Sequence, residues 1–248
     1  MPRKAREVSP TGIYHVYAIG ERTKTLTREP RDKEELVGIL RASKELFDYD
    51  LFAYVVTDNE LHLVLKERAP KDVSGIMKFI LSTYTNFYNS KYSSDGALIH
   101  DRFVSSPILS DKDLKTMIRY LHQLPVYFKE YPNVYSYPFS SYNDYFQKSP
   151  YIAFEVILPL FGDEKTALSK FKIFHAMTEL KDFRKDKRVR YTKEELGEIL
   201  FKTCGISEEE IKKLKSEEKL KIAKTLHKKT ELSLRQIEKI CHVSRALI

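Results

Sequence analysis

The sequence predicts an α+β protein: an antiparallel sheet with helices packed on it, followed by an all-helical C-terminal domain. Two observations lead to this prediction. Segments with the alternating apolar pattern of strands occur only before about residue 110, interleaved with segments of helical spacing. After about Pro150 the strand pattern stops, and everything to the C-terminus has helical periodicity, with Ser207 among the expected helix caps. We therefore expect two domains, residues 1–150 and 151–248.

The expected elements of the first domain alternate between strands and helices. Asp32 is the expected N-cap of the first helix, and Asp58-Asn59 is a two-residue hairpin signal. The order strand, helix, hairpin, helix, strand, helix fits a ferredoxin-like sheet covered by helices. The elements are a strand over 12–19, a helix over 32–47, strands over 51–57 and 60–66, a helix over 72–89, a strand over 104–109 and a helix over 111–123, ended by Pro125.

The composition fits a soluble globular protein, since 42% of the 248 residues are hydrophobic and 31% are charged. No apolar run approaches the roughly 20 residues that a membrane-spanning helix needs, and no apolar stretch of a signal peptide follows the basic start. The two cysteines, Cys204 and Cys241, are too few and too far apart for a disulfide scaffold. We therefore expect a cytoplasmic protein.

Positive charge is concentrated in the second domain. Residues 151–248 hold 22 Lys and Arg against 16 Asp and Glu, whereas the rest of the chain holds 21 against 19. The surplus is densest in Lys181–Arg190, where Lys185, Arg188 and Arg190 are candidate DNA contacts. A solvated charge run beside a helix is the alternative. The net charge of +8 favours a nucleic-acid partner.

Three residues of the first domain suggest chemistry on phosphodiesters. Glu60 and His62 lie two residues apart on an expected strand, so both side chains leave the same face. Oxygen and imidazole ligands of this kind hold a divalent cation that polarises a phosphate. Tyr120, on a helix about sixty residues later, is the candidate nucleophile. The alternatives are a solvated Glu60 and a Tyr120 that only packs in the core.

Further motifs occur in order along residues 1–146. They are Met1–Arg6, Gly12–Val16, Asn59-x-x-His62, Tyr84-x4-Asn89, Gly96-x-Leu98, Asp101–Ser105, Arg119–Val126 and Pro138–Tyr142. This set resembles the REP-associated, IS-type single-tyrosine transposases of the HUH superfamily. The resemblance implies a ferredoxin-like (RRM-like) core, a homodimer, single-stranded or hairpin DNA as substrate, and a Mg or Mn ion.

The resemblance also assigns positions to the candidate site. Tyr120 takes the place of the nucleophile, and His62 that of the second histidine in a His-hydrophobic-His pair. Glu60 stands where the first histidine is expected, and a carboxylate suits Mg or Mn. The third ligand is expected one helical turn after the tyrosine, where this chain has Leu124. Gln123 is the candidate substitute, because position i+3 also lies on the tyrosine's face.

The C-terminal segment 220–226, followed by 232–248, resembles a helix-turn-helix. Ser233 would cap one helix, and Ser244 would cap a recognition helix whose first residues contact bases. Arg235 and Arg245 are the candidate DNA contacts, and Arg245 lies where arginine commonly contacts guanine. A small helical bundle used only for packing is the alternative.

By their positions in the motifs that resemble the transposase family, Arg102 and Arg119 are candidate phosphate contacts.

Three functional hypotheses follow. The first hypothesis is a transposase-like protein that binds single-stranded or hairpin DNA and cleaves and rejoins it through a 5′-phosphotyrosine at Tyr120 with a divalent metal. The second is a domesticated, non-catalytic DNA-binding or regulatory protein, which Leu124 favours. The third is a recombination accessory that acts with an active partner subunit.

Overall fold

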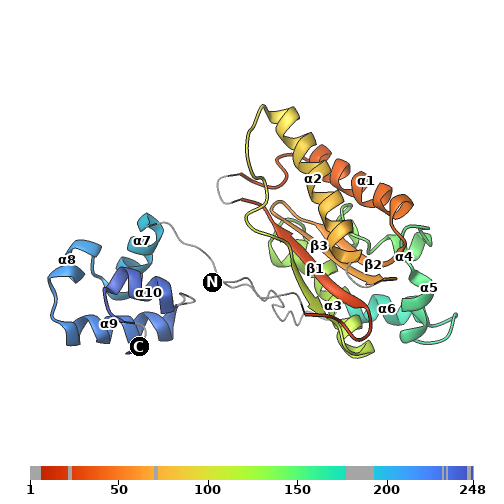
Figure 1. The fold of residues 1–248 in the computed structure, drawn as a ribbon. Coiled ribbons are helices and arrows are strands. Elements are labelled where there is room, and N and C mark those ends of the chain that lie inside the picture. The colour runs from red at the N-terminus through yellow and green to blue at the C-terminus, as the bar shows by residue number, and fades with distance from the viewer. Residues whose placement is uncertain are drawn as a thin grey trace. The chain divides into compact units, whose positions relative to one another are not determined.

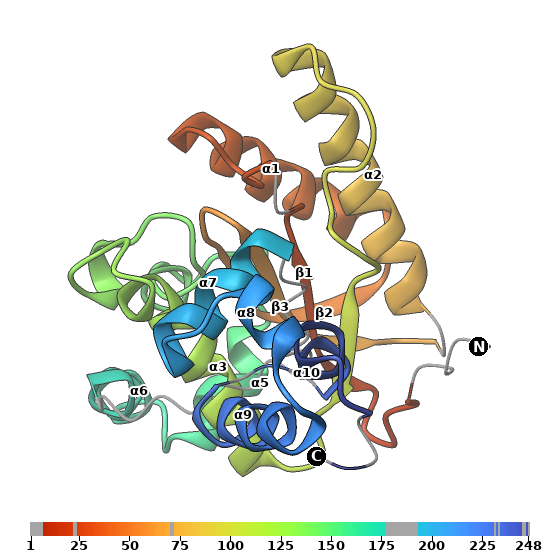
Figure 2. The same cartoon turned by 90° about the vertical axis from the view of Figure 1, so that its left-hand side faces the viewer.

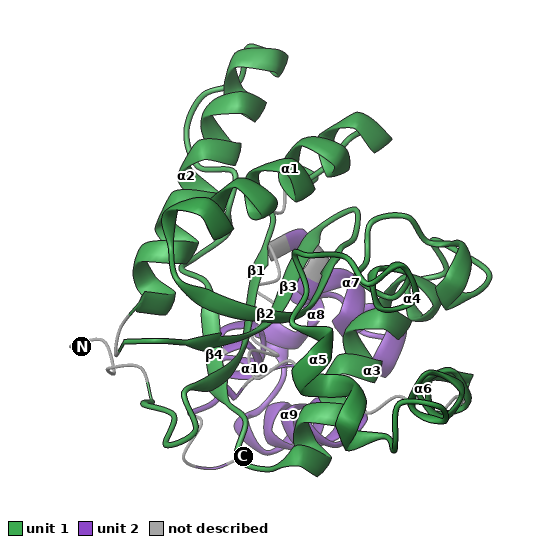
Figure 3. Ribbon diagram, turned by 90° about the vertical axis from the view of Figure 1, so that its right-hand side faces the viewer, with its two compact units in different colours: residues 1–183 green, residues 184–248 purple. Residues whose placement is uncertain are grey.

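The structure, a computed structural model, describes residues 7–21, 24–69, 72–176, 193–230, 232, 234–244 and 247. The chain divides into two compact units, residues 1–183 and 184–248 (Figure 3). Unit 1 contains a sheet and helices, and the described part of unit 2 is helical. The α+β class expected from the sequence is confirmed.

A four-stranded antiparallel sheet forms the centre of unit 1, in the order β2-β3-β1-β4 (Figure 1). The first strand pairs with both β3 and β4, so it lies in the middle of the sheet. The expected hairpin at Asp58-Asn59 connects β2 to β3. The strands are β1 (Ile13–Ile19), β2 (Tyr49–Val56), β3 (Glu60–Glu67) and β4 (Val104–Pro107).

The two faces of the sheet are covered by different helices. Helices α1 (Pro30–Leu46) and α2 (Asp72–Tyr92) lie side by side on one face (Figures 1 and 2). Alternation along β1 and β3 turns Val16, Leu61 and Leu63 to that side, and all three are fully buried. The opposite face is covered by α3 (Asp111–Tyr127), which carries Tyr120.

Helix α1 begins two residues earlier than expected. The sequence pattern predicted Asp32 as its N-cap, and this is wrong: the N-cap is Glu29, followed by Pro30 in the first turn. Asp32 is the third helical residue, and its carboxylate accepts from the backbone N–H groups of Arg28 (2.8 Å) and Glu29 (3.2 Å). Asp32 therefore caps the helix from within.

Helix α3 continues past the point where a proline was expected to end it. It runs through Pro125 to Tyr127, whereas the pattern predicted an end at Gln123. Pro125 lacks only the N–H that would reach Leu121, and the last turn is still closed by Phe128 N–H donating to the Leu124 carbonyl at 2.8 Å. Tyr127 therefore belongs to the same helix as Tyr120.

The boundary between the units lies after residue 183, C-terminal to the expected one near 150. Ile152, Ile157 and Phe171 are buried in the core of unit 1 and complete it. Their segment has helical spacing and no strands, which grouped it with the C-terminal helices in the sequence. In the described part of unit 1, five short elements follow α3. They are η1 (Val134–Ser136) and α4 (Asp144–Gln147) before residue 150, and α5 (Phe154–Ile157), η2 (Leu158–Leu160) and α6 (Ala167–Ala176) after it.

Unit 2 has a hydrophobic core of its own, formed by four helices. Ser207, an expected cap, caps α8 in a capping box with Glu210. The helix expected after Ser233 is α10, whereas Ser233 itself and Arg245 of the expected recognition helix lie outside the described residues. No helix in the described ranges is long and apolar enough to cross a membrane. The helices are α7 (Lys193–Cys204), α8 (Glu208–Lys213), α9 (Ser216–Lys229) and α10 (Leu234–Cys241).

Candidate functional site

Glu60 and His62 are in direct contact at the start of β3, on the sheet face covered by α3. His62 Nε2 lies 2.9 Å from Glu60 Oε2. An ionised carboxylate only accepts hydrogen bonds, so Nε2 carries the hydrogen and donates it. The Glu60 backbone N–H donates to Thr57 Oγ1 at 3.0 Å, which fixes the start of the strand at the hairpin. The two candidate ligands are therefore held as a pair.

His15 joins this pair from the neighbouring strand. His62 is paired with Tyr17 of β1, and His15 lies two residues before Tyr17 on the same face, diagonally opposite His62. His15 Nε2 lies 3.0 Å from His62 Nδ1. In a neutral His62 with its hydrogen on Nε2, Nδ1 accepts from His15 Nε2. Glu60, His62 and His15 are therefore joined in one row of polar contacts across β3 and β1.

Tyr120 lies edge-on to both imidazoles. Its ring centroid is 6.2 Å from those of His15 and His62, at interplanar angles of 85° and 74°. Tyr17 completes the aromatic cluster by stacking on the two histidines, with centroid separations of 5.3 and 5.2 Å. The Tyr120 side chain is buried, with an exposed fraction of 3%. The structure therefore brings the sequence-predicted Glu60, His62 and Tyr120 together.

The Glu60–His62 pair suits part of a metal site. Its two donor atoms are 2.9 Å apart, about the separation of adjacent ligands around an octahedral cation with bonds of about 2.1 Å. Gln123, the candidate third ligand, donates from Nε2 to the His175 carbonyl at 2.9 Å, and Leu124 is buried in the core. Within the described ranges, no group of three His, Cys, Asp or Glu is arranged to hold a metal.

Comparison with known proteins places this arrangement in a known fold. No protein-family profile matches the sequence, and no curated protein matches it. Among solved structures, the chain is similar to a REP-associated tyrosine transposase bound to a REP hairpin. The TM-score is 0.51 with 18% identity, over 61% of this chain and 88% of that one. The chain has the fold of this tyrosine transposase.

A second similar structure is a putative transposase from Deinococcus radiodurans R1, with 17% identity over 52% of this chain and 97% of that one. Its TM-score of 0.34 is too low to carry a structural argument. The ferredoxin-like core that the resemblance implied agrees with the element order β1-α1-β2-β3-α2-β4 and the strand order β2-β3-β1-β4 of this chain.

Two of the candidate DNA contacts are described within the transposase fold. Arg102 is exposed in the segment before β4. Arg119 precedes Tyr120 on α3, and its guanidinium lies 4.3 Å from the centroid of the Phe174 ring of α6. The Arg235 side chain is not described, although its backbone belongs to α10. The others lie outside the described residues: Lys185, Arg188, Arg190 and Arg245.

A buried histidine pair links α3 to α6 behind the candidate site. His175 Nδ1 donates to the Phe171 carbonyl at 2.8 Å, so its Nε2 accepts from His122 Nδ1 at 2.9 Å. His122 Nε2 then accepts from the Ser141 hydroxyl at 2.7 Å, and Ser141 Oγ accepts from the Tyr54 backbone N–H at 2.9 Å. One tautomer of each imidazole satisfies this whole chain of hydrogen bonds.

Both imidazoles of this pair are held neutral. Burial lowers the pKa of His122 well below its ordinary value, and the neighbouring His175 adds to the shift. Burial also lowers the pKa of His175, to about 4, and the Arg119 guanidinium opposes its protonation further. Sequence patterns did not predict the pair, because His175 lies 53 positions after His122. The one local feature that pointed to the pair was a polar His122 inside the apolar stretch after Tyr120.

Proposed function

We propose that this chain is a transposase-type DNA-binding protein that binds single-stranded or hairpin DNA and cleaves it through Tyr120. One observation carries the proposal: Tyr120 on α3 lies against the Glu60–His62 pair on the sheet. A phenol beside a hard-donor pair is the layout that phosphodiester cleavage by a tyrosine requires. The fold shared with a tyrosine transposase supports it.

The proposed reaction exchanges one phosphate ester for another. The phenolic oxygen of Tyr120 bonds to the phosphorus, and the bond from phosphorus to the 3′ oxygen of the strand breaks. The freed 3′ hydroxyl takes up a proton in place of the one that the phenol loses. The 5′ end then remains on Tyr120 as a phosphotyrosine. Because the new ester resembles the old one, a 3′ hydroxyl can reverse the step and rejoin DNA without an external energy source.

Glu60 and His62 would hold a Mg or Mn ion, which polarises the scissile phosphate when bound. A ligand nitrogen must present its lone pair, so the hydrogen of His62 must then reside on Nδ1. His15 Nε2 is the acceptor that faces Nδ1 at 3.0 Å. His15 would therefore act as a positioning residue that holds the orientation of His62 and accepts from its Nδ1 when the ion is bound.

Binding of the strand would rest on basic residues in both units. Arg119 lies next to the nucleophile, and Arg102 is exposed before β4. Unit 2 holds 18 Lys and Arg against 11 Asp and Glu, which accounts for most of the net charge of +8, and we propose that its helices, α10 among them, add a second DNA-contacting surface. As the resemblance implies, we also propose that two copies act as a homodimer.

A second candidate function is DNA binding without cleavage. Leu124 occupies the third-ligand position with an apolar side chain, and Gln123 is engaged by the His175 carbonyl. The Tyr120 side chain is also 3% exposed, so a phosphate reaches it only if α3 or a neighbouring segment moves. These observations favour a domesticated protein that keeps the transposase fold for binding or regulation.

Labelled single-stranded DNA with hairpins from the gene's own flanks distinguishes the two candidates. The protein is incubated with this DNA and Mn or Mg, and the products are separated on a denaturing gel. Cleavage predicts a covalent adduct that Tyr120→Phe abolishes and that Tyr127→Phe, on the same helix, retains. Salt-sensitive hairpin binding without an adduct under either metal would establish the second candidate instead.

A further inference from the structure

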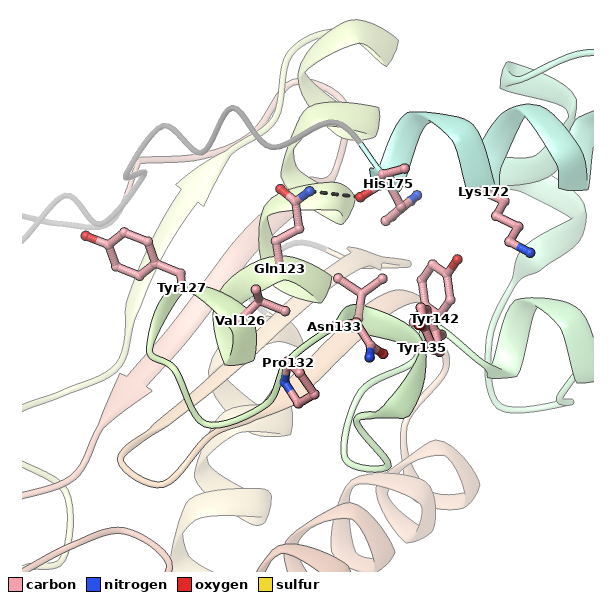
Figure 4. Close-up of a pocket in the computed structure, with 11 residues that line it drawn as sticks. Gln123, Val126, Tyr127, Pro132, Asn133, Tyr135, Tyr142, Lys172 and His175 are labelled. Carbon is pink, nitrogen blue, oxygen red and sulfur yellow. Dashed lines mark hydrogen bonds between the residues drawn. The ribbon is translucent and has the colours of Figure 1, made fainter.

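A cavity of about 370 Å³ opens along the C-terminal half of α3 (Figure 4). Helix α3 forms one wall with Gln123, Val126 and Tyr127, and the loop from Pro132 to Tyr135 forms another. Tyr142 and α6 close the remaining side, where Lys172 and His175 lie. We call this cavity the aromatic pocket. All the described residues that line it belong to unit 1.

The aromatic pocket lies along the same helix as the candidate nucleophile. Gln123 is three residues after Tyr120 and Tyr127 is seven, which correspond to about 4.5 and 10.5 Å along the helix axis. Position i+7 lies two turns on and on nearly the same side of the helix. A strand whose phosphate lies at Tyr120 and that follows α3 toward its C-terminus therefore passes the mouth of the pocket.

The lining of the aromatic pocket suits an unpaired base next to a phosphate. Tyr135 is 62% exposed and offers aromatic surface to a ligand, whereas the Tyr127 ring points away from the other lining residues (Figure 4). Lys172 supplies a cation at the end where Tyr135 and Tyr142 lie (Figure 4), and none of the described lining residues is acidic. Arg119 adds positive charge where α3 meets α6, through its contact with Phe174.

We propose that the aromatic pocket takes one unpaired nucleobase of the DNA strand, one to three nucleotides from the phosphate at Tyr120. Tyr135 provides the stacking surface, and Lys172 contacts the phosphodiester beside that base. Stacking on aromatic side chains holds single-stranded DNA with little dependence on sequence, and the volume suits a single nucleotide rather than a duplex. The proposal rests on the proposed function, since it needs a strand bound at Tyr120.

A scan of the strand with abasic sites tests this proposal. The flanking positions of the hairpin DNA are replaced one at a time, and binding is measured by fluorescence anisotropy with the full-length protein. One position is expected to weaken binding about tenfold for the wild type and not at all for Tyr135→Ala, because the stacking partner is already missing. Tyr135→Phe keeps the aromatic face and should restore the wild-type pattern.

Lys172 has a matched control, Lys170, on the same helix α6. Lys172→Ala is expected to weaken binding and to reduce its salt dependence, whereas Lys170→Ala, which is exposed outside the pocket, should leave both nearly unchanged. If the wild type and Tyr135→Ala bind the hairpin with the same dependence on the position of the abasic site, the proposed base-binding role of the pocket is wrong. The proposed function would remain intact. A wild-type protein that binds no hairpin DNA would overturn both.

Discussion

Acidification is expected to destabilise unit 1 through the buried His122–His175 pair. The folded state holds the pKa of His175 at about 4, against about 6.5 for an unperturbed histidine. Between these values the unfolded chain binds a proton at this residue and the folded chain does not. Its contribution to stability is therefore complete above about pH 6.5, falls as the pH is lowered, and levels off below about pH 4.

The size of the effect follows from the two pKa values. Lowering the pH from 8 to 5 should reduce the free energy of unfolding by about 2 kcal/mol through His175 alone. For a protein of this length, that corresponds to a fall in melting temperature of roughly 4–8 °C. His122 adds to the loss in the same direction, because burial lowers its pKa as well.

Thermal unfolding followed by near-ultraviolet circular dichroism measures this loss. The chain has no tryptophan, and all its tyrosines except Tyr191 lie within residues 1–183, so the signal reports on unit 1. His175→Gln removes the titrating group and should flatten the pH dependence, whereas His227→Leu, on the exposed side of α9, should not. An unchanged pH dependence in His175→Gln would refute the reasoning.

Three further substitutions test the metal site and the packing of unit 1. Leu124→Gln should cost about 1–3 kcal/mol of stability in urea unfolding, because it buries an amide. It should also tighten Mn binding in calorimetry by supplying a third ligand, so an unchanged affinity would count against the metal site. Gly20→Ala should destabilise unit 1 by more than about 1 kcal/mol, since its Cβ would lie 2.3 Å from Asn59 Oδ1. Gly38→Ala, whose Cβ meets nothing within 4 Å, should instead stabilise α1 by about 0.5–1 kcal/mol, and equal effects would contradict this account.

Local patterns in the sequence were enough for the order of elements and for part of the site. Alternation along one strand placed Glu60 and His62 on one face, and their contact in the structure follows from that alternation. The Asp58-Asn59 turn and the cap at Ser207 depend only on near neighbours, and both were predicted. The start of α1 differs because Asp32 can cap a helix from its third residue as well as from its N-cap.

The features that could not be predicted from the sequence depend on contacts between segments that are distant along the chain. His15 reaches His62 only through the register between β1 and β3, which joins residues 47 positions apart. The His122–His175 pair and the aromatic pocket require α6 to dock beside α3. The unit boundary moved for the same reason, because the residues around Phe171 pack on unit 1. Pro125 was misleading as a helix end, since one lost hydrogen bond near a terminus does not stop a helix.

Mass spectrometry of the protein–DNA adduct tests the central claim most directly. Trypsin cleaves after Arg119 and after Lys129, so Tyr120 and Tyr127 fall in one ten-residue peptide, Tyr120–Lys129. After incubation with hairpin DNA and Mn, nuclease treatment leaves a nucleotide on the attacked residue. The account predicts that fragmentation places this mass on Tyr120 and that His62→Ala abolishes it. A nucleotide on Tyr127 or on another peptide, or none on a protein that binds the hairpin tightly, would contradict it.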